Sequence, residues 1–209
     1  MKSALRSFAL LTLGFAAVAR GSTLYSNTTT DTLDTFFYSA GPWVVLGDRI
    51  HLISPGAASQ ANVEFSNDGS AGGTFDAELD LFDVGSPVVG ALIGTFDLTG
   101  NSIGAGKIDL SFSLGALAVP QDLIFTLSVS NVSLGVDLGV DMFEPPTVGS
   151  SDNSFMIAAT TLPNYFQLGT TNENVYFQLS AQDVPEPSSV ALVGAGLLIA
   201  GIGARRRRK

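Results

Sequence analysis

The central part of the chain alternates between hydrophobic and polar residues with a period of two. In residues 74–83, for example, Phe75 and Leu79 fall on one face of an extended segment, and acidic residues fall on the other. Alternation of this kind is typical of a β-strand with one buried face and one face in solvent. Residues 22–183 contain no useful stretch with the 3.6-residue hydrophobic stripe of an amphipathic helix. This part of the chain is therefore predicted to be all-β.

About ten strands are expected, because clusters of Gly, Pro, Asn, Asp or Ser separate most of the alternating segments. The expected strands are residues 43–53, 61–67, 74–83, 88–98, 107–115, 122–130, 136–144, 155–160, 164–169 and 174–181. Short strands with regular turn signals predict an antiparallel, β-sandwich or jelly-roll-like ectodomain over residues 22–183. The many Asp residues are expected on the solvent-exposed strand faces, where they discourage edge-to-edge pairing.

Residues 1–19 have the features of a secretory signal peptide. A basic start with Lys2 and Arg6 precedes an apolar run, and small residues follow at the position of a cleavage site. Cleavage after either Ala19 or Gly21 fits the sequence. The N-terminus thus predicts export of the chain, with the Sec machinery as a partner.

Residues 184–209 form a tail with three parts. A Pro-Glu-Pro motif comes first, an uncharged segment follows at residues 188–204, and a basic cluster ends the chain. A helix over those 17 residues would be about 26 Å long, the low edge of a membrane span. Basic residues beside a span stay on the cytoplasmic side, so the body is expected outside. The motif is Pro185, Glu186 and Pro187, and the basic cluster is Arg205, Arg206, Arg207, Arg208 and Lys209.

The order of these three parts resembles the sorting tail of PEP-CTERM proteins, which also carry a signal peptide. The resemblance implies that an exosortase, a membrane-embedded transpeptidase-like enzyme, recognises the motif and removes the tail. It also implies a Gram-negative host that makes exopolysaccharide. The protein is then expected to be anchored in the cytoplasmic membrane and, after cleavage, to reach the cell surface or the extracellular matrix of a biofilm.

Three segments of the body carry a second resemblance. Residues 24–37, 141–151 and 174–182 resemble parts of a β-sandwich ectodomain that is common among PEP-CTERM proteins. That domain has no settled activity, so the resemblance bears on fold and localisation and not on chemistry.

The net charge of −9 conceals a much more acidic body. Between Gly21 and Asp183, Arg49 and Lys107 are the two basic residues against 18 acidic ones, which gives a formal charge of −16. Nucleic-acid binding needs a basic face, so it is excluded. The chain has no cysteine, which excludes disulfides, thiol nucleophiles and cysteine-bound metals. A body of this size can bury enough apolar surface for one core without them.

One segment has the form of a nucleophile elbow. Residues 100–104 read Gly-Asn-Ser-Ile-Gly, with Ser102 at the centre. An elbow joins a strand to a helix and precedes its histidine in the chain. Here a strand pattern follows, and the single histidine, His51, comes earlier. We therefore predict a hairpin turn at this segment, a strand position for His51 that faces solvent or pairs across the sheet, and no catalytic residues.

Two binding hypotheses stay open. Trp43 and Tyr38, with Phe36 and Phe37 beside them, could form a platform for sugar rings, or they could belong to the core. Several acidic clusters could supply oxygen ligands to calcium, although none has the spacing of an EF-hand. The default for these clusters is a solvated strand face, so no metal site or cofactor is predicted. The clusters are Asn67-Asp68-Gly69, Glu78-Asp80-Asp83, Asp137-Asp141 and Asp152-Asn153.

The sequence thus predicts a non-enzymatic, exported protein of the cell surface or matrix, in association with exopolysaccharide. The alternative is a carbohydrate-binding, lectin-like module of the same fold. A hydrolase is the third possibility. It would need a cleft with converging Asp, Glu or Ser-His groups, and a buried carboxylate pair would favour it.

Overall fold

The computed structural model describes residues 22–40, 45–85, 89–158, 166–168 and 174–181. Thirteen β-strands and one short 3₁₀ helix lie within these ranges, and every strand pair is antiparallel. The elements are β1 (Thr23–Asn27), β2 (Asp31–Phe37), η1 (Tyr38–Ala40), β3 (Val45–His51), β4 (Gly56–Asn67), β5 (Gly73–Val84), β6 (Val89–Ile103), β7 (Gly106–Val119), β8 (Asp122–Ser130), β9 (Leu138–Phe143), β10 (Ser150–Ala158), β11 (Phe166–Leu168), β12 (Asn174–Val175) and β13 (Phe177–Ala181). The predicted all-β, antiparallel fold is confirmed. The expected signal peptide and membrane helix lie outside the described residues.

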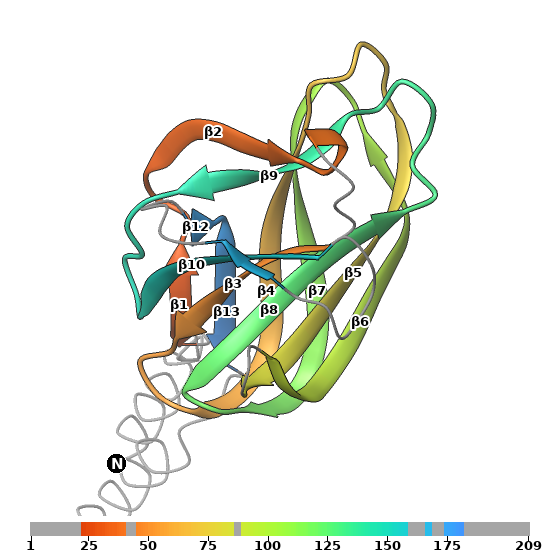
Figure 1. Ribbon diagram of the computed structural model, residues 1–209. Coiled ribbons are helices and arrows are strands. Elements are labelled where there is room, and N and C mark those ends of the chain that lie inside the picture. Colours follow the sequence, from red (N-terminus) through yellow and green to blue (C-terminus); the bar gives the residue numbers. More distant parts are fainter. Residues whose placement is uncertain (1–21, 41–44, 86–88, 159–165, 169–173, 182–209) are drawn as a thin grey trace, which may run out of the picture. The chain divides into compact units, whose positions relative to one another are not determined.

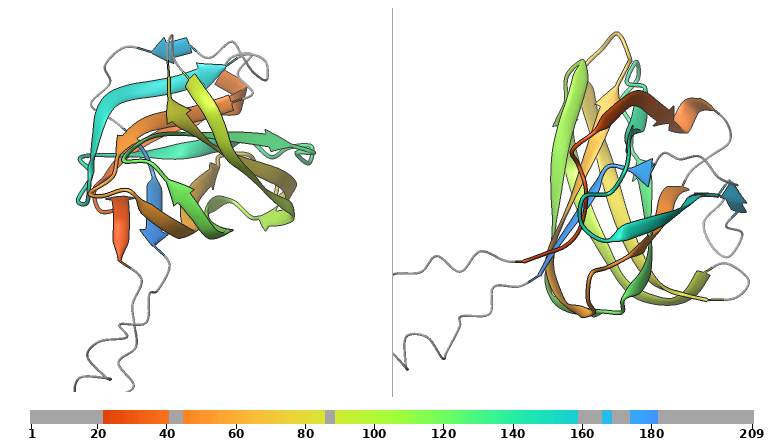
Figure 2. Two further views of the ribbon diagram at one scale, coloured as in Figure 1. Left: turned by 90° about the horizontal axis from the view of Figure 1, so that it is seen from below. Right: turned by 90° about the vertical axis from the view of Figure 1, so that its left-hand side faces the viewer.

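Four nested strand pairs organise these elements. Strand β5 pairs with β6, β4 with β7, β3 with β8, and β2 with β9. The pairing places β3, β8, β5 and β6 in a six-stranded sheet, and β2, β9, β4 and β7 in a seven-stranded sheet (Figures 1 and 2). Nested antiparallel pairs divided between two sheets are the strand arrangement of a jelly roll. The additional strands extend both sheets.

The hydrophobic faces of the two sheets meet in one core. Phe125 of β8 stacks on Phe177 of β13 with ring centroids 3.9 Å apart, and Phe65 of β4 contacts Phe75 of β5 at 5.4 Å. All four rings are buried, so they join the two sheets across the interior. Burying a side chain of this size stabilises the fold by roughly 1.5–3 kcal/mol. The alternation in the sequence therefore identified the inward faces correctly.

The body begins and ends on neighbouring strands. Strand β1 pairs with β13, Thr23 lies opposite Ser180, and the backbone N–H of Ala181 donates a 2.8 Å hydrogen bond to the carbonyl of Ser22 (Figure 1). The first and last described residues of the body thus leave the seven-stranded sheet at one place.

Candidate functional site

The structure contradicts the proposed role of Tyr38 in an exposed sugar platform. Its ring belongs to the core with 9% of its surface exposed, and its hydroxyl donates a 3.1 Å hydrogen bond to the carbonyl of Leu127. Burial also raises the pKa of the Tyr38 hydroxyl. A ring in this position has no free face on which a sugar could stack. Trp43, the other member of the proposed platform, lies outside the described residues.

The residues of the apparent nucleophile elbow belong to a strand. Ser102 lies near the end of β6 opposite Thr74. The predicted hairpin is wrong, because the short turn after Ile103 leads to β7, which belongs to the other sheet and pairs with β4. His51 lies on β3, three strands away from β6 in the same sheet, because β8 and β5 lie between them. That separation corresponds to about 14 Å between strands. His51 is exposed, and its Nδ1 lies 2.9 Å from a carboxylate oxygen of Asp122. The segment therefore does not form a catalytic centre with the histidine.

The acidic clusters do not converge on a metal site in the described part of the chain, where no group of three or more metal-binding side chains occurs. Instead they hold loops and strands together. Asn67 Oδ1 accepts hydrogen bonds from the N–H groups of Gly69 and Asp137, both at 2.9 Å. A carboxylate oxygen of Asp137 accepts a 2.6 Å hydrogen bond from Ser39, and Asp152 pairs with Arg49 at 3.4 Å.

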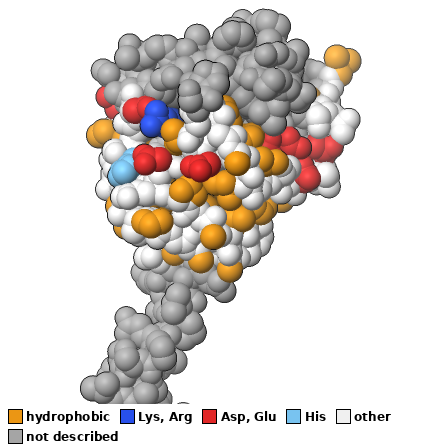
Figure 3. All heavy atoms as spheres, turned by 60° about the horizontal axis from the view of Figure 1, so that its bottom comes forward, with side chains coloured by type: hydrophobic (Ala, Val, Ile, Leu, Met, Phe, Trp, Pro, Cys, Tyr) orange, Lys and Arg blue, Asp and Glu red, His pale blue; other side chains and the backbone are white. Residues whose placement is uncertain are grey.

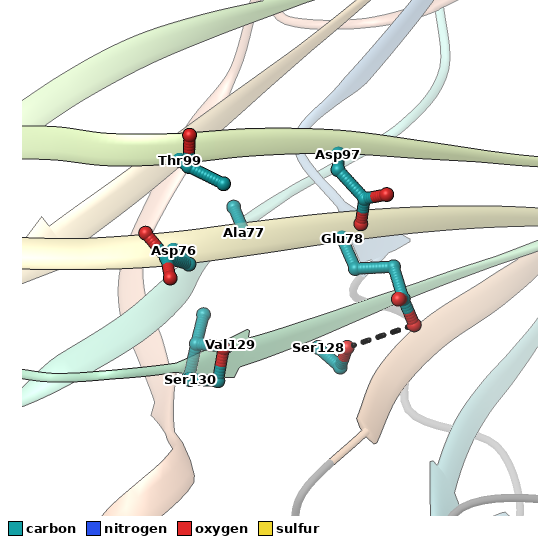
Figure 4. A pocket seen from close by; sticks show the side chains of 8 residues that line it. All are labelled: Asp76, Ala77, Glu78, Asp97, Thr99, Ser128, Val129 and Ser130. Carbon is teal, nitrogen blue, oxygen red and sulfur yellow. Dashed lines mark hydrogen bonds between the residues drawn. The ribbon is translucent and has the colours of Figure 1, made fainter.

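A shallow hollow of about 320 Å³ lies on the outer face of the six-stranded sheet (Figure 4). Carboxylates and hydroxyls dominate its wall. Glu78 accepts a 3.4 Å hydrogen bond from Ser128, and its side chain lies beside that of Asp97 in Figure 4. Burial, together with the negative charges of Asp80 and Asp97, raises the pKa of Glu78. The lining residues are Asp76, Ala77, Glu78, Asp97, Thr99, Ser128, Val129 and Ser130.

A second hollow, of about 370 Å³, lies where β3, β8 and β10 meet. It combines one of the two basic residues of the body with the histidine, because Arg49, His51, Asp122 and Asp152 all line it. Figure 3 shows basic and histidine side chains beside acidic ones on a face that also carries scattered hydrophobic groups. Each charged group here already has a partner of opposite sign or a hydrogen bond.

The other basic residue, Lys107, lies at the centre of a carboxylate cluster on the seven-stranded sheet. Its Nζ lies 2.7 Å from Asp31, 3.1 Å from Glu64 and 2.9 Å from Asp141. It also lies 5.7 Å from the centroid of the Phe143 ring. The carboxylates come from β2, β4 and β9, while Lys107 comes from β7. The sequence analysis missed this cluster, and the one available signal was that a body with 18 acids contains a single lysine.

Burial differs sharply among the three carboxylates. The Asp141 side chain is 1% exposed, whereas that of Glu64 is 16% exposed and that of Asp31 is 31% exposed. Burial and a hydrogen bond with Asp141 raise the pKa of Glu64 to about 7. Asp31 behaves in the opposite way, because hydrogen bonds from Lys107 and the N–H of Leu33 lower its pKa.

Glu64 and the buried Asp141 are a carboxylate pair of the kind that would favour a hydrolase, but they hydrogen-bond each other and Lys107 binds to both. Two-carboxylate glycosidases keep the corresponding space open for the sugar and water. Here the lysine ammonium contacts both groups, at 3.1 and 2.9 Å. The arrangement therefore favours chemistry within the cluster over chemistry on an external substrate.

Comparison with known proteins identifies a known sorting motif at the end of the chain. Residues 183–208 match the PEP-CTERM protein-sorting motif. A motif of this type indicates sorting of an exported protein by an exosortase, which is a membrane enzyme. The matched segment contains the Pro-Glu-Pro residues and most of the basic cluster predicted from the sequence, all outside the described residues. No curated protein matches the chain.

Within the stretches that the structure describes, no helix has the length and hydrophobicity needed to cross a bilayer.

Proposed function

We propose that the chain is a non-enzymatic protein of the cell surface or extracellular matrix, which is delivered there by removal of its C-terminal tail. The observation that carries the proposal is the match of residues 183–208 to the PEP-CTERM sorting motif. An exposed, strongly acidic β-domain with no cysteine is suited to an extracellular setting, because its net charge keeps it soluble and it needs no disulfides.

In this proposal the chain is exported through the Sec machinery, and residues 1–19 are removed. Residues 188–204 then hold the protein in the cytoplasmic membrane, with Arg205–Lys209 inside and the β-domain outside. The exosortase acts next to Pro185, Glu186 and Pro187. Two prolines favour an extended backbone there, which supports access to the motif by the enzyme.

The absence of an enzymatic activity belongs to the same proposal. Two observations support it among the described residues: Lys107 forms ion pairs with both Glu64 and Asp141, and Ser102 has no histidine beside it.

A second candidate function is polysaccharide binding at the hollow of Figure 4. Its wall of carboxylates and hydroxyls offers hydrogen-bond partners for the hydroxyl groups of a sugar chain. In this alternative, Asp97→Ala weakens retention of host exopolysaccharide on the purified protein, and Asp109→Ala on the other sheet does not. Equal retention by both variants and by the unchanged protein would count against this site.

The test of sorting uses the full chain in a host that has an exosortase. Membrane, surface and medium are separated, and the intact mass of the protein in each is measured. We expect a surface product without Arg205–Lys209, and a Glu186→Ala variant that keeps these residues and stays in the membrane fraction. Glu144→Ala is the matched control, since Glu144 also precedes a proline but lies in the body. A surface product that retains Arg205–Lys209 would refute the proposal.

A further inference from the structure

The Lys107 cluster brings together the groups needed to form a covalent bond between two side chains. Lys107 and Glu64 project from paired strands, because Ser66 of β4 lies opposite Lys107, and Glu64, two residues before Ser66, is on the same face of the strand. On the other side of β4, Phe65 pairs with Val140, which brings the next residue of β9, Asp141, beside Glu64. An amine, a buried carboxyl group and a second carboxyl group thus meet across β7, β4 and β9.

We propose that Lys107 and Asp141 join spontaneously in an amide bond between their side chains, with Glu64 as the catalytic acid. The amine nitrogen lies 2.9 Å from Oδ2 of Asp141. The other oxygen, Oδ1, accepts a 2.5 Å hydrogen bond from the Thr35 hydroxyl. Holding two reacting groups at this range makes the reaction effectively unimolecular, which removes much of its entropic barrier.

The proposed reaction balances without any further reagent. The Lys107 ammonium first gives a proton to the carboxylate pair, and the neutral amine then attacks Cγ of Asp141 to form a C–N bond. Negative charge collects on Oδ1, where the Thr35 hydroxyl stabilises it. The Cγ–Oδ2 bond breaks as Glu64 protonates the leaving oxygen, and Glu64 recovers a proton from the new amide nitrogen. In total, one ammonium and one carboxylate become one amide and one water, with no change in charge or oxidation state.

Burial identifies Asp141, and not Asp31, as the carboxyl group that the amine of Lys107 attacks. Asp141 is 1% exposed, so bulk water has little access to the intermediate. Asp31 is 31% exposed, and hydrogen bonds from Lys107 and Leu33 N–H lower its pKa, so it remains an ionised and unreactive carboxylate. Glu64 suits the acid role because its pKa, about 7, leaves a proton available near neutral pH.

Asp31 also sets the rate of the reaction. Burial alone would lower the pKa of Lys107, but hydrogen bonds to Asp31, Asp141 and Glu64 raise it on balance. The neutral amine is therefore rare, and the bond is expected to form slowly after folding. Removing the negative charge of Asp31 should make the amine more available and the reaction faster.

Digestion with trypsin gives a direct readout, because Lys107 and Arg49 are the only sites for this protease between Gly21 and Asp183. The full chain is produced, kept folded for increasing times, denatured and digested. We expect the fraction cut after Lys107 to fall with time. A fragment that begins at Ile50 and runs past Asp141 should accumulate, lighter by one water molecule, and fragmentation by mass spectrometry should place the link at Lys107 and Asp141.

Four variants test the roles of Lys107, Glu64 and Asp31 in forming the bond. Lys107→Arg should remain cleavable at position 107 and should lose no water. Glu64→Gln should slow the loss of water by about 100-fold or more. Asp109→Asn changes an exposed acid opposite Glu64 on β7 and should leave the rate unchanged. Asp31→Asn leaves the buried pair intact and should react faster than the unchanged chain, which keeps the proposal testable if Glu64→Gln does not fold.

Three results would overturn the proposal. The first is complete cleavage after Lys107 in the folded, aged protein, with no loss of water. The second is a link to Asp31 in place of Asp141, and the third is an unchanged or slower reaction in Asp31→Asn. Circular dichroism of each variant shows whether it retains the β-fold before its rate is compared.

Discussion

Asp48 is an acidic side chain in the core, with 0% of its surface exposed. Its Oδ1 accepts hydrogen bonds from Arg49 N–H at 2.7 Å and from the Ser151 hydroxyl at 3.2 Å. Burial nevertheless raises the pKa of Asp48 well above its usual range. The folded protein therefore holds this proton more tightly than the unfolded chain, and the stability from this group declines as the pH rises from about 4 toward the folded pKa.

The substitution Asp48→Asn should remove this decline, since the amide stays neutral at every pH. At pH 7 we expect the free energy of unfolding to increase by about 1–3 kcal/mol, the penalty for burying a poorly satisfied polar or charged group. At pH 4 the variant and the unchanged protein should be similar in stability. Urea unfolding followed by fluorescence at pH values from 4 to 8 measures both the difference and its slope.

Asp76 provides a control, because its pKa is shifted in the opposite direction and its effect on stability has the opposite pH dependence. It accepts hydrogen bonds from Asn131 Nδ2 at 2.5 Å and from Gly100 N–H at 2.7 Å, and these lower its pKa. The stability it contributes is present above its unfolded pKa and is lost as the pH falls through the folded value. Asp76→Asn should thus lose stability at neutral pH and none in acid. A loss for both variants in the same pH range would contradict this account of the two carboxyl groups.

The same residues show what a sequence pattern can and cannot reveal. Alternation in residues 43–53 places Asp48 on the same face as Leu46 and Ile50, and all three are buried. The pattern alone cannot show that Ser151, about a hundred residues later, supplies a hydrogen bond. For the same reason the Lys107 cluster was not predicted, because its acids come from three strands that are distant in sequence.

Strands β3 and β8 approach each other closely at Gly47, and this contact depends on the missing side chain. A Cβ atom at Gly47 would lie 2.1 Å from the carbonyl oxygen of Phe125. Gly47→Ala should therefore push the two strands apart and cost about 1–3 kcal/mol or more. Gly104→Ala is the matched control, because nothing lies within 4 Å of its added Cβ, and it should change stability by less than about 0.5 kcal/mol. Equal thermal unfolding midpoints for the two variants would contradict the close approach.

At the level of elements, alternation predicted most of the central strands but missed β1 and β2. Strand β1 buries a polar residue, Asn27, so it does not have a hydrophobic inner face throughout. The Asn27 amide donates hydrogen bonds to the carbonyls of Phe143, Asn174 and Val175. The partners of the amide nitrogen lie on strands β9 and β12, and no local rule could anticipate partners so distant in sequence.

The segment at residues 174–181 was predicted as one strand, but it forms two. Strand β12 pairs with β9, and β13 pairs with β4. Tyr176 lies between them, and its N–H donates a 2.8 Å hydrogen bond to the carbonyl of Asp141. The alternation continues through Tyr176, so the sequence carries no sign that the segment changes its partner strand here.

Ion pairs offset only a small part of the negative charge of the body. Arg49 pairs with Asp152, and Lys107 pairs with three acids, so that most of the acidic residues that the structure describes lie outside an ion pair with Lys or Arg. The exposed pair of Arg49 and Asp152 contributes about 0–1 kcal/mol. A formal charge of −16 on a compact domain produces repulsion that unfolding relieves. Repulsion is therefore expected to outweigh the ion pairs in low salt.

Salt should thus stabilise this protein, contrary to the expectation for a fold held by exposed ion pairs. Raising NaCl from about 10 mM to about 500 mM shortens the screening distance from about 30 Å to less than 10 Å, which weakens repulsion between distant acids. We expect the thermal unfolding midpoint at pH 7 to rise with salt. At about pH 3, below the ordinary pKa values of Asp and Glu, most of the acids are protonated and the same salt should have little effect. A midpoint that falls with NaCl at pH 7 would mean that the ion pairs of Arg49 and Lys107 outweigh the repulsion of the whole body.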